Sequence, residues 1–336
     1  MKTIDFEAHY YSQSYLDIMY ARQTCPRFQQ KTETEVRKLW YFNDVGQPFA
    51  DTLLEHLMDL GEGRLAQMDK YGIDIQILSL SAPGIEQLEP QTGTELARRV
   101  NDELAEVIRR YPDRFMGYAA LAPKDPAKAS DELERTVTEL GFKGWNTHSN
   151  FGDSYIDDKR YWPILERAEK LGVPIYLHPT VPAISQLRDY GFALAGAPFG
   201  FGLETAMTMM RLIYSGVMDR YPNLKFILGH LGEALPFLIK RIDWAYVRPF
   251  DPHSRPALER KPSEYLHSNV FVTTSGNYYE PAFKCTLEAF GIEKILLGTD
   301  YPYEAPEECM AFIDALDIGD DDKAKILGRN AAHILR

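Results

Sequence analysis

The chain has 336 residues, a length that suits one large domain or two smaller ones. Its 37 lysine and arginine residues and 49 aspartate and glutamate residues give a formal net charge of -12. This acidic excess argues against nucleic acid or an anionic membrane as the main partner, because both attract a basic surface.

One unit recurs along the chain: a stretch with helical spacing ends near a glycine or proline, and a short apolar run follows it. Runs that are apolar nearly throughout are typical of strands buried on both faces, as in parallel sheets. The runs lie, in chain order, within residues 4–9, 70–83, 110–123, 139–149, 170–180, 220–232, 268–276 and 290–300.

The stretches between these runs predict helices. After the third run, Ser130 is placed to cap a helix whose apolar residues Leu133, Val137 and Leu140 are four and three residues apart. Gly141 marks the expected end of that helix.

Eight alternations of strand and helix predict an α/β fold, a (β/α)8 barrel. An open, doubly wound sheet is the alternative. The count of eight runs and the lack of a GxGxxG turn weigh against the open sheet. We therefore predict a single barrel over residues 1–336.

Two stretches exceed ordinary loop length. Residues 10–62 separate the first two predicted strands, and residues 182–205 follow the fifth. Long excursions after barrel strands belong to the face that carries the active site, so we expect both to cover the substrate. Contact between subunits is the alternative, and the two roles are compatible.

Polar side chains gather at the carboxyl ends of the predicted strands, where barrel enzymes carry their chemistry. In a strand, residues two apart share a face, so the carboxylate and imidazole of the first strand lie together. The polar residues are Glu7, His9, Asn146, His148, His178, His230 and Asp300.

Each of these residues has a plain structural explanation by itself. A buried His178 is more often a hydrogen-bonded core residue than a ligand, and Asp300 suits a turn. Together, carboxylates and imidazoles that converge at one barrel mouth make a mixed oxygen and nitrogen site for a divalent cation. A cation also removes the repulsion that the carboxylates would otherwise feel.

Several motifs carry a family resemblance: Glu7-x-His9, "YLHP" around His178, "GHLGE" at 229–233 and "GTDYPY" at 298–303. With "RYPDRF", "ELGFKG" and "FGFGLETAM", they make almost the whole chain resemble the amidohydrolase superfamily. The closest resemblance is to its metal-dependent decarboxylase branch. That branch contains aminocarboxymuconate-semialdehyde decarboxylase and the γ-resorcylate, 2,3-dihydroxybenzoate and 5-carboxyvanillate decarboxylases.

The resemblance implies a distorted (β/α)8 barrel and a set of metal ligands. It implies one divalent ion, Mn²⁺ or Zn²⁺, and the high share of oxygen ligands favours Mn²⁺. In the hydrolytic branch a histidine usually stands where this chain has Glu7, which favours decarboxylation. The positions that match the ligands are Glu7, His9, His178 and Asp300.

Further site residues follow from the same resemblance. His230 matches a catalytic histidine, Glu233 its carboxylate partner, and Arg241 an arginine that contacts the substrate. His148 stands where many relatives have a small amide, and we expect it to bind substrate. Tyr301 is expected in the pocket too, and so is Tyr303 two residues later. The alternatives are a first-turn acid for Glu233, a surface arginine for Arg241, and packing for both tyrosines.

The expected activity is non-oxidative decarboxylation of a hydroxybenzoate-type acid, by protonation of the ring and then loss of carbon dioxide. Asp300 is the expected proton donor. The first alternative is a metal-dependent hydrolase of a lactone, ester or amide, in which Asp300 would serve as the base. The second alternative is a binding protein without catalysis.

The remaining expectations concern location and partners. Cys25, Cys285 and Cys309 lie far apart and form no CxxC pair, which suits a reducing cytoplasm. We see no signal peptide and no apolar run near the roughly 20 residues of a membrane span. We therefore expect a cytoplasmic homodimer or homotetramer that acts on a small aromatic carboxylic acid.

Overall fold

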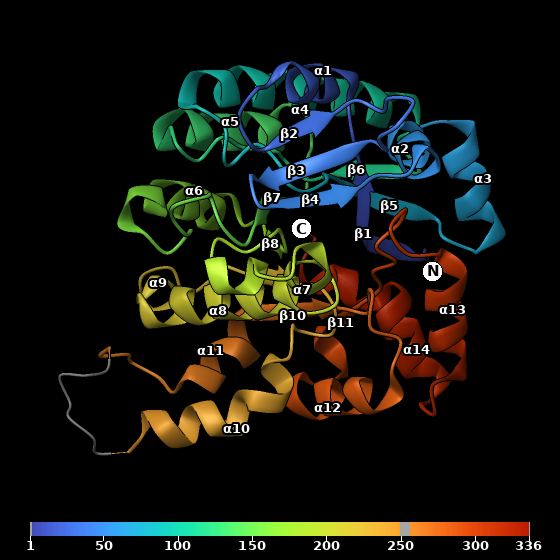
Figure 1. The fold of residues 1–336 in the computed structure, drawn as a ribbon. Coiled ribbons are helices and arrows are strands. Elements are labelled where there is room, and N and C mark those ends of the chain that lie inside the picture. The colour runs from blue at the N-terminus through green and yellow to red at the C-terminus, as the bar shows by residue number, and fades with distance from the viewer. Residues whose placement is uncertain (1, 249–255, 336) are drawn as a thin grey trace.

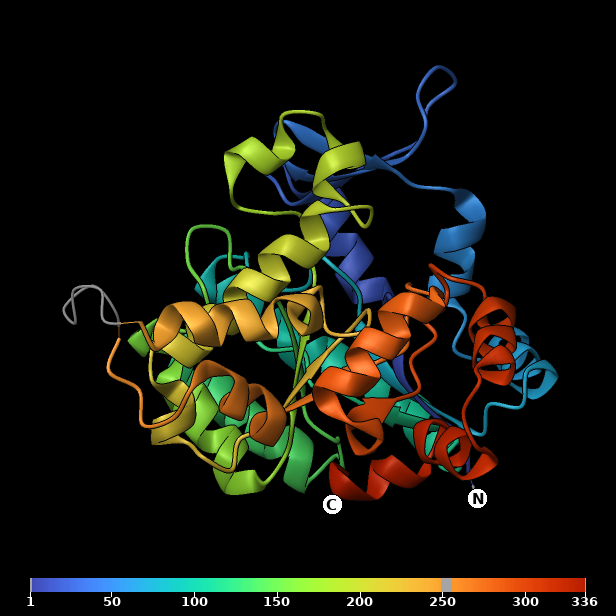
Figure 2. The same cartoon turned by 90° about the horizontal axis from the view of Figure 1, so that it is seen from below.

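The computed structural model of the chain describes residues 2–248 and 256–335. In that part of the chain, parallel strands form a barrel in two groups, β1-β5-β6 and β11-β10-β9-β8-β7 (Figures 1 and 2). A hydrogen bond of 2.8 Å from Phe6 N–H to Leu297 O joins β1 to the residue after β11. A bridge between Ala119, which follows β6, and Trp145 joins that part of the chain to β7. The strands are β1 (Ile4–Tyr10), β5 (Ile75–Leu80), β6 (Phe115–Gly117), β7 (Trp145–His148), β8 (Ile175–His178), β9 (Phe226–Leu228), β10 (Val270–Thr273) and β11 (Ile295–Leu296).

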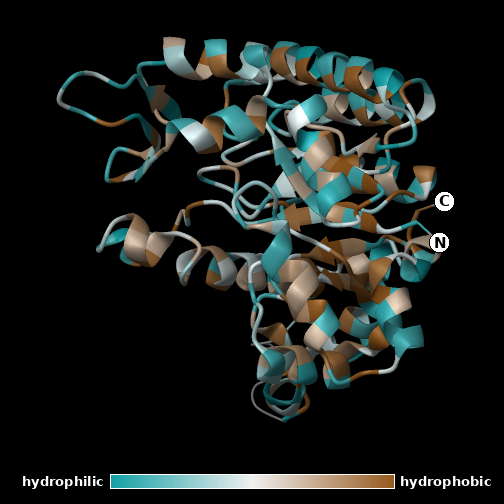
Figure 3. Cartoon of the chain, turned by 90° about the vertical axis from the view of Figure 1, so that its right-hand side faces the viewer, coloured by the Kyte–Doolittle hydropathy of each residue, from teal (hydrophilic) through white to brown (hydrophobic). Residues whose placement is uncertain are grey.

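Each predicted apolar run contains one of these strands, so the predicted distorted (β/α)8 barrel is confirmed. Helices surround the strands, and Figure 3 shows apolar residues concentrated in the strands and on inner helix faces. None of the described helices is long and apolar enough to cross a membrane. From residue 62 on, the described helices of eight or more residues are α3 (Glu62–Lys70), α4 (Pro90–Arg110), α5 (Pro126–Thr138), α6 (Trp162–Leu171), α8 (Gly200–Tyr214), α10 (Leu235–Tyr246), α11 (Pro262–Asn269), α12 (Glu280–Phe290), α13 (Pro306–Ala315) and α14 (Asp320–Leu327).

The start of α5 corrects one prediction. The helix begins at Pro126, and its cap is Asp125, whose carboxylate accepts a hydrogen bond from the Lys128 N–H. Ser130 lies inside the helix and donates to the Pro126 carbonyl at 2.7 Å. The predicted cap was wrong because proline fits the first helical position, so the helix starts five residues earlier than predicted.

A layer of apolar side chains fills the barrel interior. Because side chains alternate along a regular strand, the residue two positions after an interior residue of β8 also faces inward. Tyr176 belongs to this layer, so His178 stands above it at the carboxyl end of β8. The other members of the layer on the strands are Phe6, Ile77, Ile227, Phe271 and Leu296.

The segment 10–62 has secondary structure of its own. It contains the helices α1 (Gln13–Ala21) and α2 (Asp51–Met58) and an antiparallel sheet. Phe28 of that sheet packs edge-on against Tyr11 and Phe49, with ring centroids 5.8 and 5.3 Å apart. The strands of the sheet are β2 (Arg27–Gln29), β3 (Lys38–Phe42) and β4 (Val45–Pro48).

The second long segment, 182–205, lies against the first. It contains α7 (Phe192–Ala195), which contacts β4. We call the two segments, 10–62 and 182–205, the cover. The Arg188 guanidinium lies 3.1 Å from an Asp44 carboxylate oxygen, and the Phe192 ring stacks on Tyr41 at 6.3 Å between centroids.

Candidate active site and metal centre

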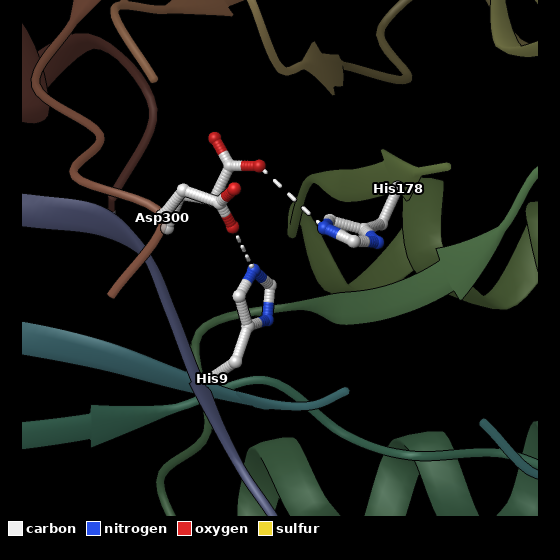
Figure 4. A group of neighbouring side chains, drawn as sticks. His9, His178 and Asp300 are labelled. Carbon is white, nitrogen blue, oxygen red and sulfur yellow. Dashed lines mark ion pairs between the residues drawn. The ribbon is translucent and has the colours of Figure 1, made fainter. Parts of the chain in front are cut away.

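Four side chains from distant parts of the chain meet at the carboxyl end of the barrel. Glu7 and His9 come from β1, His178 from the end of β8, and Asp300 from the chain after β11. One possible ligand atom from each lies within 4.8 Å of the others. His9 Nε2 is 2.9 Å from Asp300 Oδ1, and His178 Nε2 is 3.6 Å from Glu7 Oε1 (Figure 4).

The hydrogen bonds around this group fit a bound cation. Among the described residues, buried Glu7 Oε1 has no hydrogen-bond partner, and buried His9 Nε2 has only the Asp300 carboxylate beside it. His178 Nδ1 lies 2.8 Å from the Pro179 carbonyl, which leaves Nε2 free to bind a metal ion. Ser79 Oγ, 2.9 Å from His9 Nδ1, orients the second imidazole in the same way.

Burial also favours metal binding by His178. Burial, followed by the neighbouring imidazoles of His9 and His148, lowers the pKa of His178 well below its ordinary value. The imidazole is therefore neutral at physiological pH, which is the form that binds a metal ion. Two carboxylates and two imidazoles make a donor set suited to Mn²⁺ or Zn²⁺.

Close packing holds Glu7 in place. Thr273 Oγ1 donates to Glu7 Oε2 at 2.7 Å. On the other side, a Cβ atom added to Gly298 would lie 2.7 Å from Thr273 Cβ and 3.1 Å from Glu7 Cβ. Only glycine at position 298 leaves room for this arrangement, since contacts this short displace one of the groups.

Gly298→Ala is therefore expected to weaken Mn²⁺ binding by about 10-fold or more, as is typical when a ligand's supporting groups are disturbed. Equilibrium titration of the metal-free protein with Mn²⁺ measures this. Gly319→Ala is the matched control, because nothing lies within 4 Å of a Cβ there. An unchanged dissociation constant in folded Gly298→Ala would contradict the proposed packing role.

His230 and Glu233 form a pair beside the metal group. His230 Nδ1 lies 2.7 Å from Glu233 Oε1, while its Nε2 faces Glu7 Oε1 at 3.9 Å and Asp300 Oδ2 at 4.0 Å. The backbone φ angles of His230, Glu233 and Asp300 are 53°, 54° and 57°, in the left-handed region that residues other than glycine rarely adopt. Strain of this kind collects at functional sites.

Charges set the protonation of this group. Burial alone would lower the pKa of His230, but the Glu233 and Glu7 carboxylates raise it well above its ordinary value. Burial alone would raise the pKa of Asp300, but hydrogen bonds with His230 and His9 hold it below its usual range. Without a cation, the His230 ring is therefore protonated on both nitrogens and positively charged, and the Asp300 carboxylate is ionised.

A cavity of about 180 Å³ opens beside the metal group, and a neighbouring one of about 440 Å³ shares His230 and Asp300 with it. Both parts of the cover reach the smaller cavity. Besides His178, its walls include Tyr41, Gln47, Phe192, Phe201, Ser81 and Tyr303.

The family model described as Amidohydrolase matches residues 4–336. The chain belongs to the amidohydrolase family. A γ-resorcylate decarboxylase of Polaromonas sp. (strain JS666) is 39% identical over 297 residues, which cover 84% of this chain and 90% of the relative. The family membership that the motifs predicted is thus confirmed.

Solved structures of decarboxylases resemble this amidohydrolase along its whole length. The crystal structure of 5-carboxyvanillate decarboxylase LigW from Sphingomonas paucimobilis superposes with a TM-score of 0.89 at 35% identity, and covers 100% of this chain and 99% of its own. A dihydroxybenzoic acid decarboxylase from Polaromonas sp. JS666, with bound manganese and the inhibitor 2-nitroresorcinol, gives 0.84 at 33% identity, with coverages of 99% and 96%.

The structure places three predicted substrate contacts of this amidohydrolase away from the cavity wall. His148 is buried behind His178, and its Nδ1 lies 3.1 Å from Glu86 Oε1. Arg241 is exposed on α10, with its guanidinium carbon 4.4 Å from the centre of the Trp244 ring. Substrate contact by these two residues stays a prediction.

Tyr301 is the third of these residues, and its contact with substrate also stays a prediction. Its ring lies against the Arg64 guanidinium, 4.8 Å from centroid to Cζ, and stacks on His56. Tyr303 lines the cavity instead, and its hydroxyl lies 2.6 Å from Ser81 Oγ. A turn follows Asp300, so the alternation that holds in a strand does not extend to these tyrosines.

Sequence reasoning missed several residues that support the site, among them Ser79, Thr273, Gly298 and the aromatic walls from the cover. The "TTSG" and "LLGTD" runs carry a detectable signal, because polar and small residues replace apolar ones where each strand ends. No pattern in the sequence separates Phe192 and Phe201 from ordinary core aromatics.

Proposed function

We propose that this amidohydrolase is a metal-dependent, non-oxidative decarboxylase of a hydroxylated aromatic acid. The observation that carries the proposal is a metal group of carboxylates and imidazoles that opens into a small, aromatic-lined cavity. The relatives named as γ-resorcylate and 5-carboxyvanillate decarboxylases support the same chemistry. The hydrolase alternative has no comparable support among these relatives.

The chemistry explains the choice of residues. Direct loss of carbon dioxide from an aromatic acid would leave an aryl anion, which is too high in energy. A hydroxyl group ortho or para to the carboxylate allows protonation of the ring carbon first, with formation of a dienone. A bound Mn²⁺ would be held by Glu7, His9, His178 and Asp300, and would stabilise negative charge on substrate oxygens.

The protonation states suggest how one proton moves. Asp300 must gain a proton before it can donate one, and His230 carries a proton at Nε2, 4.0 Å from Asp300 Oδ2. After this transfer, neutral His230 accepts the proton of the substrate hydroxyl, while Asp300 protonates the ring carbon that bears the carboxylate. The carbon–carbon bond then breaks, its electrons restore the aromatic ring, and the phenolate regains its proton from His230. Glu233 keeps the His230 ring oriented throughout.

Two further features belong to this proposal. We propose a homo-oligomer, supported by exposed apolar side chains on α10: Phe237 is 83% exposed and Trp244 42%. We also propose a cytoplasmic location, supported by three free cysteines, of which Cys309 is fully buried.

A panel of hydroxybenzoates tests the function. Protein reconstituted with Mn²⁺ is expected to release carbon dioxide and a phenol from acids with a 2- or 4-hydroxyl group. 3-Hydroxybenzoate is the matched control, because a meta hydroxyl cannot stabilise the protonated ring, and no turnover is expected. Ultraviolet absorbance follows the reaction. Hydrolysis of lactones, esters or amides without release of gas would instead establish the alternative.

A further inference from the structure

Arg64, on α3, is a fully buried arginine that makes no ion pair with any of the described carboxylates. Its guanidinium and Nε groups donate instead to three backbone carbonyls, those of His9 at 2.7 Å, Asp59 at 2.8 Å and His56 at 3.0 Å. Burial lowers its pKa to about 10, so the side chain keeps its charge at neutral pH. A buried charge without a carboxylate partner is costly, which makes its placement informative.

The first contact of Arg64 is with a proposed metal ligand. It holds the carbonyl of His9, and the N–H of the same residue donates to the Tyr301 carbonyl at 2.7 Å. The ring of Tyr301 also lies under the guanidinium. Tyr301 directly follows Asp300, so this one cation contacts both segments whose side chains, His9 and Asp300, approach to 2.9 Å.

The other contacts of Arg64 reach the cover. His56 belongs to α2 and Asp59 follows that helix, at the end of segment 10–62. The Leu57 carbonyl also accepts a hydrogen bond from the Tyr11 N–H at 3.0 Å, just beyond β1. Arg64 therefore joins the end of the cover to the strand that carries Glu7 and His9.

Arginine suits this position better than lysine. Its planar group carries five N–H donors in fixed directions, so it can satisfy several carbonyls and still present a flat face to an aromatic ring. A lysine ammonium is a single point charge that cannot reach all these partners from one place. The contacts thus depend on the guanidinium, and not only on positive charge.

We propose that Arg64 is a positioning residue for the metal centre, which sets the spacing of His9 and Asp300 and fixes the adjoining edge of the cover. The proposal rests on the metal group and on no particular substrate. Loss of the guanidinium is expected to let β1 and the segment that carries Asp300 separate. The affinity of the site for the cation would then fall.

Arg64→Lys tests this in the full chain. The expected result is a rise of about 10- to 100-fold in the Mn²⁺ dissociation constant, the range typical for groups that orient metal ligands. Electron paramagnetic resonance of free Mn²⁺ measures the constant. At saturating Mn²⁺, kcat for a substrate from the panel is expected to fall more than KM changes, because the ligand geometry stays altered.

Arg114→Lys is the matched control. This arginine also donates to backbone carbonyls, those of Asp74 at 2.9 Å and Ile73 at 3.3 Å, but it lies at the opposite end of β5 from the metal group. For this variant we expect a Mn²⁺ affinity within about twofold of wild type, since these contacts of Arg114 do not involve the segments that carry the proposed metal ligands.

The proposal is overturned if Arg64→Lys is folded and binds Mn²⁺ within twofold of wild type. It is also overturned if Arg114→Lys weakens Mn²⁺ binding equally, since the loss would then reflect general loosening of the barrel. Arg64→Met keeps much of the apolar stem but removes the charge and the donors, so it too is expected to weaken Mn²⁺ binding, and a folded Arg64→Met with wild-type affinity would equally overturn the proposal. Wild-type protein that binds Mn²⁺ without decarboxylating any acid would refute the proposed function and leave this test intact.

Discussion

Asp300→Asn is expected to slow decarboxylation by about 100- to 10,000-fold, the range that a positioned general acid contributes. Asparagine keeps a similar shape and one oxygen toward the metal group, but it cannot deliver a proton to the ring carbon. Single-turnover measurements with the best substrate of the panel, at saturating Mn²⁺, would show the loss in the chemical step.

Glu308→Gln is the control for this variant, since Glu308 is an exposed acid on α13 close in sequence to Asp300. Its rate is expected to match wild type. If Asp300→Asn binds Mn²⁺ and turns over within about 10-fold of wild type, another group protonates the ring, and the role assigned to Asp300 is wrong.

Glu7→Gln is expected to weaken Mn²⁺ binding by more than about 100-fold, beyond the effect of changing a group that only supports a ligand. The amide keeps the size of the side chain but removes a negative charge that lies fully buried. Decarboxylation at micromolar Mn²⁺ is expected to disappear with the metal. Metal analysis after gel filtration provides the measurement.

Thermal unfolding separates this effect from misfolding. Wild-type protein is expected to gain about 2.7 kcal/mol of stability when free Mn²⁺ reaches 100 times its dissociation constant. Glu7→Gln is expected to gain almost nothing at the same Mn²⁺ concentration, while its metal-free form unfolds cooperatively. If Mn²⁺ stabilises Glu7→Gln as much as it stabilises wild-type protein, Glu7 is not a ligand.

Local sequence patterns were sufficient to locate the strands and their polar ends. Glu7, His9, His178 and Asp300 stand where apolar runs stop, and parallel strands in a barrel bring their carboxyl ends to one mouth. The sequence could therefore predict that these groups meet. It could not give the 2.9 Å approach of His9 to Asp300, which depends on how β1 closes against the chain after β11.

Errors and omissions arose where distant contacts decide the outcome. Tyr301 and Tyr303 differ in role because a turn after Asp300 directs one ring toward Arg64 and the other toward the cavity. Arg64 was not singled out from the sequence, since spacing alone does not reveal which charged side chain becomes buried. The sheet β2–β4 was expected only as a long excursion, because its strands are three to five residues long and give no clear pattern.

The barrel and the cover contribute different residues to the site, and this difference has an evolutionary consequence. The groups proposed to bind the cation and to move the proton lie at strand ends, where buried neighbours fix them. Tyr41 and Phe192, by contrast, reach the cavity from two surface segments that hold each other through Arg188 and Asp44. Substitutions and length changes in those segments can therefore alter which ring is accepted while the reaction itself is retained. New substrate ranges can therefore arise through sequence changes in the two segments of the cover. Because Tyr41 and Phe192 are in contact, a change at one of them will often require a change at the other.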